Sequence, residues 1–222
     1  DVNFDISAGG AGKGMTDALT GSVDIGLVSR EVSPQELEKG ALPIAVVKDA
    51  VVPMMNARNP VRDLLQKSGL KREVFEGVWL REDVTTWGAA AGTDDMSPIH
   101  VYTRSDACGA AETWARYLGK KQEDLKGIGV YGDPGLGEAV RRDPMAIGFN
   151  NVNYAYDAKT SKPVAGLDVI PLDVNGNGIL DDSEKCYATV QELVSAIADG
   201  RFPSPPARPL YFVTKGQPGN NL

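Results

Sequence analysis

A glycine-rich segment near the start of the chain has the composition of an anion-binding loop. Residues 7–15 read Ser-Ala-Gly-Gly-Ala-Gly-Lys-Gly-Met and follow an alternating run, residues 2–6, that predicts a strand. Glycines let successive backbone N–H groups point into one small volume, and the helix predicted to follow adds its positive end. Because Lys13 places a charge beside them, we expect this segment to bind an oxyanion through Gly10, Ala11, Gly12 and Lys13.

A second segment repeats the same order of elements. The apolar run 99–103 predicts a buried strand, residues 104–110 form a loop of small residues with one cation, Arg104, and residues 111–118 predict a helix. Two such units that face each other would enclose an anion between two lobes. We therefore expect Arg104, Cys108, Gly109 and Ala110 to complete the site.

Other chemistry at these residues fits the sequence less well. A nucleotide P-loop would need glycine at Ser7 and a magnesium-binding hydroxyl at Gly14. Cys108 could act as a nucleophile at a helix N-terminus, where the pKa of a thiol falls, but no obvious base accompanies it. His100 is the only histidine, and its apolar surroundings predict a packed strand residue instead of a catalytic one.

A third segment, residues 173–184, has the spacing of a twelve-residue EF-hand loop. The glycine of the turn is Gly178, and the predicted calcium ligands are Asp173, Asn175, Asn177, the carbonyl of Ile179, Asp181 and Glu184. The alternative is an Asn-Gly hairpin turn with scattered acids, which would not require Glu184. We expect a structural Ca²⁺ here, weakly bound because two ligands are asparagines, as suits an extracellular calcium level.

Length and composition limit the classes of protein. The 222 residues, 42% hydrophobic and 24% charged, can form one large domain or two lobes. A net charge of −7 argues against a general nucleic-acid binder. No apolar run approaches the roughly 18 residues that a membrane span needs. Because the chain opens on a strand-like pattern without Met, we expect upstream sequence to have been removed.

Strand-like and helix-like runs alternate around these segments, which predicts an α/β protein. Residues 2–28 have the order strand, loop, helix, strand of a parallel unit, and Ser29 and Arg30 would lie on the same rim as the glycine-rich loop. Two buried strands are expected at 42–47 and 50–55, and an amphipathic helix at 190–197. The three tryptophans are expected in the core: Trp79, Trp87 and Trp114.

Several of these pieces resemble the phosphate-binding proteins of phosphate ABC transporters. The resemblance rests on residues 21–31 (Gly-Ser-Val-Asp-Ile-Gly-Leu-Val-Ser-Arg-Glu), 104–114, 132–140 with 146–149, and 202–203 with 210–211, in matching order and spacing. It implies a two-lobed, type II periplasmic-binding-protein-like fold, in which each lobe is a mostly parallel sheet flanked by helices. We expect residues 1–47 with 151–222 to form the first lobe and 48–150 the second. Relative to the family, the first strand, its ligand-binding loop and the first helix are missing.

The resemblance also maps the family's binding motifs onto this chain. The first glycine loop of the family supplies hydroxyl groups, where this chain has Ala11 and Lys13. The family's arginine with Ser-Gly-Thr corresponds to Arg104 with residues 108–110, so one hydroxyl becomes a thiol and another is lost. Some relatives carry an aspartate near Ser29 that accepts the hydrogen of protonated phosphate, and this chain has Arg30 and Glu31 there.

The resemblance thus implies a solute-binding protein, and not an enzyme. It would bind phosphate or a related oxyanion in the cleft between its lobes and deliver it to an ABC-transporter permease. We expect a monomer that works in the periplasm or elsewhere outside the cytoplasm, anchored, if at all, through a missing N-terminal segment. Two alternatives stay open: an enzyme that acts on a phosphorylated substrate, and a degenerate binding lobe used for protein contacts.

Overall fold

The computed structural model describes residues 3–7 and 9–218. The strands of this part are β1 (Gly26–Val28), β2 (Ala41–Asn56), β3 (His100–Arg104), β4 (Ile128–Val130), β5 (Ala146–Asn151), β6 (Leu167–Val169) and β7 (Ala207–Lys215). The α-helices are α1 (Ala11–Thr20), α2 (Pro34–Glu38), α3 (Arg62–Ser68), α4 (Arg72–Glu76), α5 (Trp87–Ala91), α6 (Gly109–Tyr117), α7 (Gly132–Arg142), α8 (Val152–Ala155) and α9 (Val190–Asp199). A π-helical turn, η1 (Gly77–Arg81), and a 3₁₀ turn, η2 (Gln122–Asp124), complete them.

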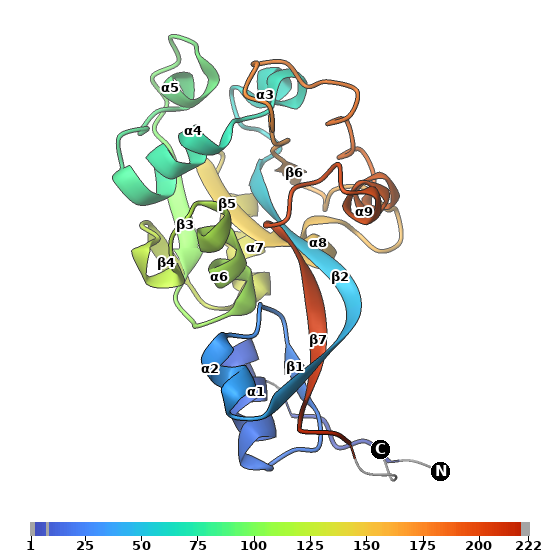
Figure 1. Cartoon of the computed structure of the whole chain (residues 1–222). Coiled ribbons are helices and arrows are strands. Elements are labelled where there is room, and N and C mark those ends of the chain that lie inside the picture. The colour runs from blue at the N-terminus through green and yellow to red at the C-terminus, as the bar shows by residue number, and fades with distance from the viewer. Residues whose placement is uncertain (1–2, 8, 219–222) are drawn as a thin grey trace.

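Two hydrophobic clusters lie in two bodies that β2 and β7 connect (Figure 1). The small unit is built on the cluster Ala11, Met15, Ala18, Val28, Ala41 and Val213. The large unit contains a much larger cluster, in which all three tryptophans are fully buried, as predicted. β2 and β7 run antiparallel from one body to the other. The chain therefore crosses twice between the units, and the predicted two-lobed α/β architecture is confirmed.

The seven strands of the described residues form one sheet in the order β1-β7-β2-β5-β3-β4, with β6 beside β2. Strand β3 pairs in parallel with β4 and β5, whereas β2 pairs antiparallel with β5, β6 and β7. The expected mostly parallel sheets are thus found only around β3. The reason is that β2 and β7 are antiparallel neighbours that extend through both units.

The clusters divide the chain differently from the expected lobe boundaries. Buried residues of the segment expected to join the first lobe, such as Tyr156, Leu193 and Phe202, belong to the large cluster. They do so because α8, β6 and α9 pack against β2 in the large unit. Of the elements described in the C-terminal third of the chain, β7 is the one that contributes to the small cluster, through Val213.

The expected strand at residues 2–6 is absent from the described residues, since residues 3–7 are irregular and Val2 lies outside them. Among the described strands, β1 lies at the edge of the sheet and pairs only with β7, antiparallel; residues 3–7 do not pair with its open edge, so the predicted parallel unit does not form. Phe4 and Ile6 are accordingly 80% and 79% exposed. A strand requires a hydrogen-bonded partner, and an alternating pattern alone does not provide one.

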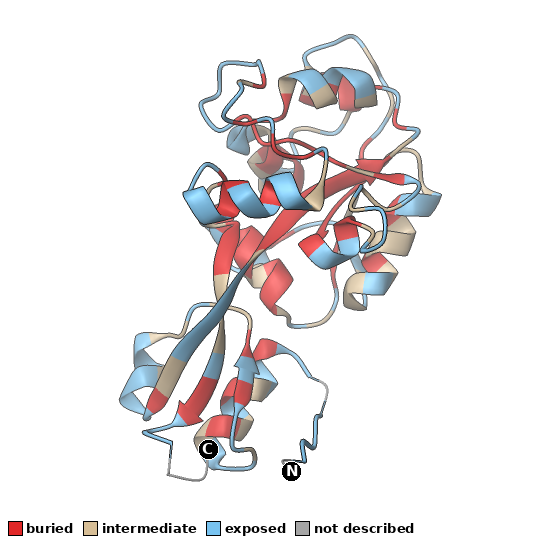
Figure 2. Ribbon diagram, turned by 90° about the vertical axis from the view of Figure 1, so that its right-hand side faces the viewer, coloured by how far each residue is buried: buried red, intermediate tan, exposed pale blue. Residues whose placement is uncertain are grey.

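The two strands expected at 42–47 and 50–55 are one 16-residue strand, β2. Lys48 and Asp49 interrupt the apolar pattern where the strand passes between the units, and Figure 2 shows the exposed stretch there. On the face of the small unit's sheet away from α1, Leu27, Phe212 and Ile44 are register partners and are 58%, 40% and 43% exposed. The small unit therefore buries one face of its sheet and leaves an apolar row open on the other.

Candidate functional site

The glycine-rich segment forms the first turn of α1. The helix begins at Ala11, inside the glycine-rich segment and not after it as predicted, and Gly10 is its N-cap. Because glycine has no side chain to accept a hydrogen bond, the first-turn N–H groups of α1 have no side-chain cap. The N-terminus of α1 is therefore a partly positive surface made of backbone. The side chain of Lys13 lies along the helix, where its ammonium pairs with Asp17 one turn later.

The second segment has the predicted order of strand, loop and helix. β3 ends at Arg104, and α6 begins at Gly109 with Cys108 as its N-cap, whose Sγ accepts from the N–H of Ala111 at 3.5 Å. Gln122 fixes the loop, because its Oε1 accepts from the N–H of Cys108 at 3.0 Å and its Nε2 donates to the carbonyl of Asp106 at 2.7 Å. The side chain of Gln122, which itself lines the cleft, thus holds this loop in place through contacts that the sequence pattern did not reveal.

The two segments face each other across the gap between the units. A Cβ added to Gly10 would lie 2.7 Å from the carbonyl oxygen of Ala107, and one added to Gly109 would lie 2.5 Å from that of Ser29. Only residues without a side chain permit these backbone approaches. The structure therefore brings together the two loops that were predicted to enclose an anion.

A cleft of about 1330 Å³ opens between these loops. The predicted anion contacts that line it are Gly10, Ala11, Gly12, Lys13, Arg30, Arg104, Cys108 and Gly109. Ser29 lies beside Gly109, and Ala110 is buried within α6, so neither is part of the lining. Additional acidic and basic residues, which no sequence motif marked, also line the cleft: Glu36, Glu112, Arg116 and Glu123.

Carboxylates neutralise the predicted cations of this cleft. The Arg30 guanidinium pairs with both oxygens of Glu36, at 2.9 and 2.7 Å, and it lowers the pKa of that carboxyl to about 2. Ser33 adds to this effect, because its N–H donates to the same carboxylate in a capping box. An anion in the cleft would therefore meet backbone N–H groups and predicted cations that are already paired with carboxylates.

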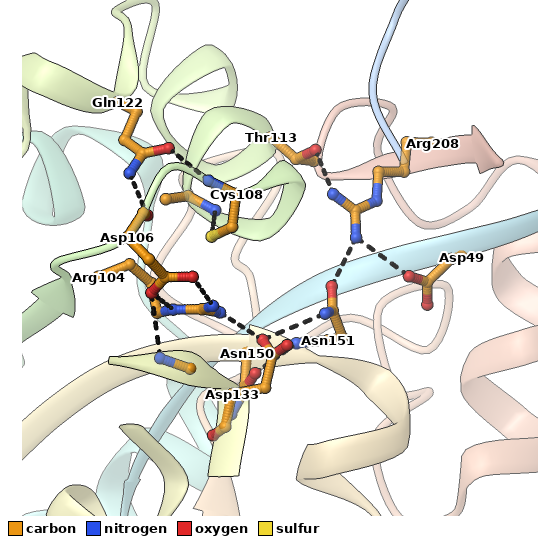
Figure 3. A network of polar contacts seen from close by, with 12 residues as sticks. Asp49, Arg104, Asp106, Cys108, Thr113, Gln122, Asp133, Asn150, Asn151 and Arg208 are labelled. Atoms are coloured by element: carbon orange, nitrogen blue, oxygen red, sulfur yellow. Dashed lines mark hydrogen bonds and ion pairs between the residues drawn. The ribbon is translucent and has the colours of Figure 1, made fainter. Parts of the chain in front are cut away.

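Arg104 has the most complete set of partners. Its Nε and Nη2 donate to the two oxygens of Asp106 at 2.8 and 2.6 Å, and its Nη1 donates to Asp133 at 2.6 Å (Figure 3). The side chain is 4% exposed, and its guanidinium holds the pKa of Asp106 below the usual value. Two carboxylates thus fix the orientation of the one buried cation in the cleft lining.

The thiol of Cys108 is less reactive than its place at a helix N-terminus suggested. Burial raises the pKa of Cys108 above the ordinary value for a thiol, so it is protonated at neutral pH. His100, expected to be packed, is instead 46% exposed on β3 and bonds Asp143 through Nδ1 at 2.7 Å. His100 is not part of the cleft lining, so it is not placed to serve as a base for Cys108 there.

The loop at residues 173–184 folds around two buried carboxylates. Asp173 accepts from the N–H groups of Gly176, Asn177 and Gly178, and Glu184 accepts from those of Val174, Asn175 and Asp181. Asp173 and Glu184 are 4% and 6% exposed, and neither forms a salt bridge with a described residue. Within the described residues, no three His, Cys, Asp or Glu side chains gather as a metal-binding group.

The carboxylate of Asp181 accepts from the side-chain amides of Asn175 and Asn177, at 2.7 and 3.0 Å. Ile179, whose backbone carbonyl is a predicted ligand, is 64% exposed at the tip of the loop. Both loop glycines have a positive φ, 72° for Gly176 and 79° for Gly178. The structure thus gives the predicted ligands a common loop, and the residues that would donate oxygen atoms are bonded to the loop itself.

Comparison with known proteins places the chain among binding proteins. Residues 1–221 match the family model of the PBP superfamily domain. The phosphate-binding protein PstS of Bacillus subtilis (strain 168) is 28% identical over 165 residues, which are 72% of this chain and 51% of that protein. The phosphate-binding protein PstS 2 of Streptococcus agalactiae serotype V is 33% identical over 76 residues, which are 34% of this chain and 25% of that protein. The chain thus spans a quarter to a half of these curated relatives.

Solved structures share the fold at lower sequence identity. A candidate phosphate ABC transporter substrate-binding protein of Clostridium perfringens, solved with bound phosphate, has a TM-score of 0.68 and 21% identity over 93% of this chain and 72% of its own. An ABC-type phosphate transport receptor of Vibrio cholerae has a TM-score of 0.67 and 19% identity over 96% of this chain and 75% of its own. As for the membrane, the described helices include none with the length and apolarity to span one.

Proposed function

The chain belongs to the PBP superfamily, and on that premise we propose that it binds phosphate or a related oxyanion between its two units for uptake by an ABC transporter. The observation that carries this proposal is the cleft in which the N-termini of α1 and α6 meet beside Arg104. Backbone N–H groups at helix N-termini are suited to anions. The anion would be held and released without any bond being made or broken.

The numbers of positive and negative side chains in the cleft indicate which interactions would select the anion. The lining contains four cations, Lys13, Arg30, Arg104 and Arg116, and four acids, Glu31, Glu36, Glu112 and Glu123. Long-range attraction is therefore weak in a protein whose net charge is −7. Recognition would depend on short hydrogen bonds from the two helix N-termini and the guanidinium of Arg104, which reward a small tetrahedral oxyanion.

Calorimetric titration of the purified chain with phosphate, sulfate and arsenate tests this function. We expect one anion to bind per chain. The absence of binding by all three would reject the function and favour a binding lobe adapted to protein contacts. Hydrolysis of a phosphate ester that is lost in Cys108→Ala would favour the enzyme alternative instead, although the raised pKa of the Cys108 thiol argues against it.

Replacing Gly109 with alanine is expected to lower phosphate affinity by about tenfold or more. The new Cβ would lie 2.5 Å from the carbonyl oxygen of Ser29 and 3.0 Å from Nη1 of Arg208, so the small unit must move away from α6. Overpacking of this kind costs about 1–3 kcal/mol. Gly137→Ala in α7 is the matched control, because a Cβ there has only an ordinary contact, 3.7 Å from Asn150. Equal affinities in the two variants would contradict the interpretation.

We further propose that the loop of residues 173–184 binds a structural Ca²⁺. The support is the ligand spacing and the burial of Asp173 and Glu184, because buried carboxylates are usually paired or bound to a cation. An ion at this position would draw the side chains of Asp181 and the two asparagines inward, away from their contacts with one another. The ion would hold the two ends of the loop together, and its exposed tip at Ile179 would become more ordered.

Calcium is expected to raise the midpoint temperature of thermal unfolding of the wild-type protein. At about 10 mM Ca²⁺ and the weak affinity of extracellular modules, mass action contributes about 1.4–2.7 kcal/mol, or roughly 3–10 °C. The shift should disappear in Glu184→Gln and persist in Glu38→Gln, whose carboxylate is exposed on α2. Differential scanning fluorimetry with calcium and with a chelator gives the answer. If the wild-type protein has the same unfolding midpoint with calcium as with the chelator, the proposed ion is rejected.

A further inference from the structure

The two crossing strands carry an ion pair whose guanidinium lies inside the protein. Asp49 of β2 and Arg208 of β7 are register partners, and Nη2 of Arg208 donates to Asp49 at 3.2 Å. Arg208 is 5% exposed and its Nη1 donates to Thr113 of α6 at 2.8 Å. Its Nε has no hydrogen-bond partner among the described residues. The place of Arg208 is therefore set by contacts at its two terminal nitrogens.

One amide connects this ion pair to the cleft. Oδ1 of Asn151, the last residue of β5, accepts from Nη2 of Arg208 at 2.5 Å. Its Nδ2 donates at 3.2 Å to the same Asp133 oxygen that accepts from Arg104 (Figure 3). The chemistry fixes the orientation of the amide. If it were flipped, an NH₂ group would face the guanidinium and a carbonyl oxygen would face the carboxylate.

The resulting chain of contacts joins five side chains from five elements. It begins at Asp49 on β2 and passes through Arg208 on β7, Asn151 on β5 and Asp133 on α7 to Arg104 on β3. Asp106 closes the far end, which leaves two guanidinium groups among three carboxylates. In such a set, a neutral amide that accepts from one partner and donates to the next keeps like charges apart.

We propose that Asn151 and Arg208 are positioning residues of the anion cleft, which hold Asp133 and through it orient the guanidinium of Arg104. Neither residue lines the cleft. Arg208 lies on the connecting strand β7, and Asn151 lies on β5 beside the other connecting strand, β2. Nη1 of Arg208 also lies 3.0 Å from the position of a Cβ at Gly109. The same side chain therefore supports the second anion loop and the crossing between the units. This inference rests on the proposed function for its binding readout.

Asn151→Asp tests the proposal with a change of almost no volume. The new carboxylate still accepts from Arg208 but cannot donate to Asp133, so two carboxylates meet. The charged groups around it are Asp133 and Arg208 in contact, and Arg104, Asp49 and Asp106 beyond them. We expect phosphate affinity at pH 7.5 to fall by about tenfold or more, the loss that one hydrogen bond to a charged group implies.

A pH profile separates positioning from a purely structural effect. Two close carboxylates share a proton as the pH falls, so the ratio of wild-type to variant affinity should shrink towards pH 5. Taking this ratio at each pH cancels the titration of phosphate itself. The control is Asn153→Asp, which adds the same charge two residues later at an exposed position of α8 and should leave the affinity unchanged. A ratio near one at pH 7.5, or one that does not change with pH, would overturn the proposal.

A second measurement needs no ligand. The side-chain N–H signals of Arg104, observed by NMR in the anion-free protein, should shift in Asn151→Asp and stay in place in Asn153→Asp. Unchanged signals in Asn151→Asp would overturn the positioning role, even if phosphate binds. If the wild-type protein binds no phosphate but the Arg104 signals differ between it and Asn151→Asp, the proposed function is rejected and the positioning of Arg104 is supported. The two failures are therefore distinguishable.

Discussion

Arg104→Met is expected to lower phosphate affinity by at least about 30-fold. Arg104 is the buried cation of the cleft lining, and its removal leaves the carboxylates of Asp106 and Asp133 without their cationic partner. Removing one partner of a buried, hydrogen-bonded charge pair costs about 2–5 kcal/mol, much of it from the charge left behind. Calorimetry with phosphate measures the affinity, and urea denaturation measures the accompanying loss of stability.

The control for Arg104→Met is Arg81→Met. Arg81 also pairs with two carboxylates, Asp83 and Glu76, but its side chain is 48% exposed and is not part of the cleft lining. Exposed pairs contribute about 0–1 kcal/mol, so this variant should bind phosphate like the wild type. Phosphate affinity that survives in Arg104→Met would show that the helix N-termini alone hold the anion.

Trp114→Ala is expected to cause the largest loss of stability, about 3–5 kcal/mol. Trp114 is fully buried in the large unit and packs edge-to-face on Phe75 and Trp79, at 5.3 and 5.4 Å between ring centroids. It also stacks on Phe149 at 5.9 Å. The truncation opens a cavity where helix α6 meets the sheet. Since α6 presents the second anion loop, binding should weaken together with stability.

Denaturant midpoints measure the effect of Trp114→Ala. The control is Tyr131→Ala, which removes an aromatic ring of similar size that is 79% exposed. Such a surface change usually stays within about 0.5 kcal/mol. A midpoint for Trp114→Ala equal to that of the control would contradict the packing described for the large unit.

The anion loops could be predicted because their signals are local. At residues 99–118, an apolar run, small residues and a helical pattern follow one another, and the structure has β3, the loop and α6 there. The same kind of local pattern gave a wrong prediction for the N-terminal segment, which was expected to form a strand at residues 2–6. Its alternating pattern requires a hydrogen-bonded partner, and residues 3–7 do not pair with the open edge of β1.

The partners of the charged residues could not be predicted. Arg104 and Asp133 are 29 positions apart, and Arg208 and Asp49 are 159 apart, so only the folded chain shows that they meet. Asp49 does leave a trace in the sequence, since with Lys48 it interrupts an otherwise apolar run. The interruption predicts a gap between two strands, whereas it marks the point where one strand crosses between the units.

Backbone amide NMR during a phosphate titration tests the central claim most directly, because it reports on both loops at once. If one anion lies between the N-termini of α1 and α6, the amides of Gly12 and Lys13 and those of Gly109 and Ala110 should shift together and give one dissociation constant. Signals that move in one loop only, or in neither, would contradict a shared site between the two units.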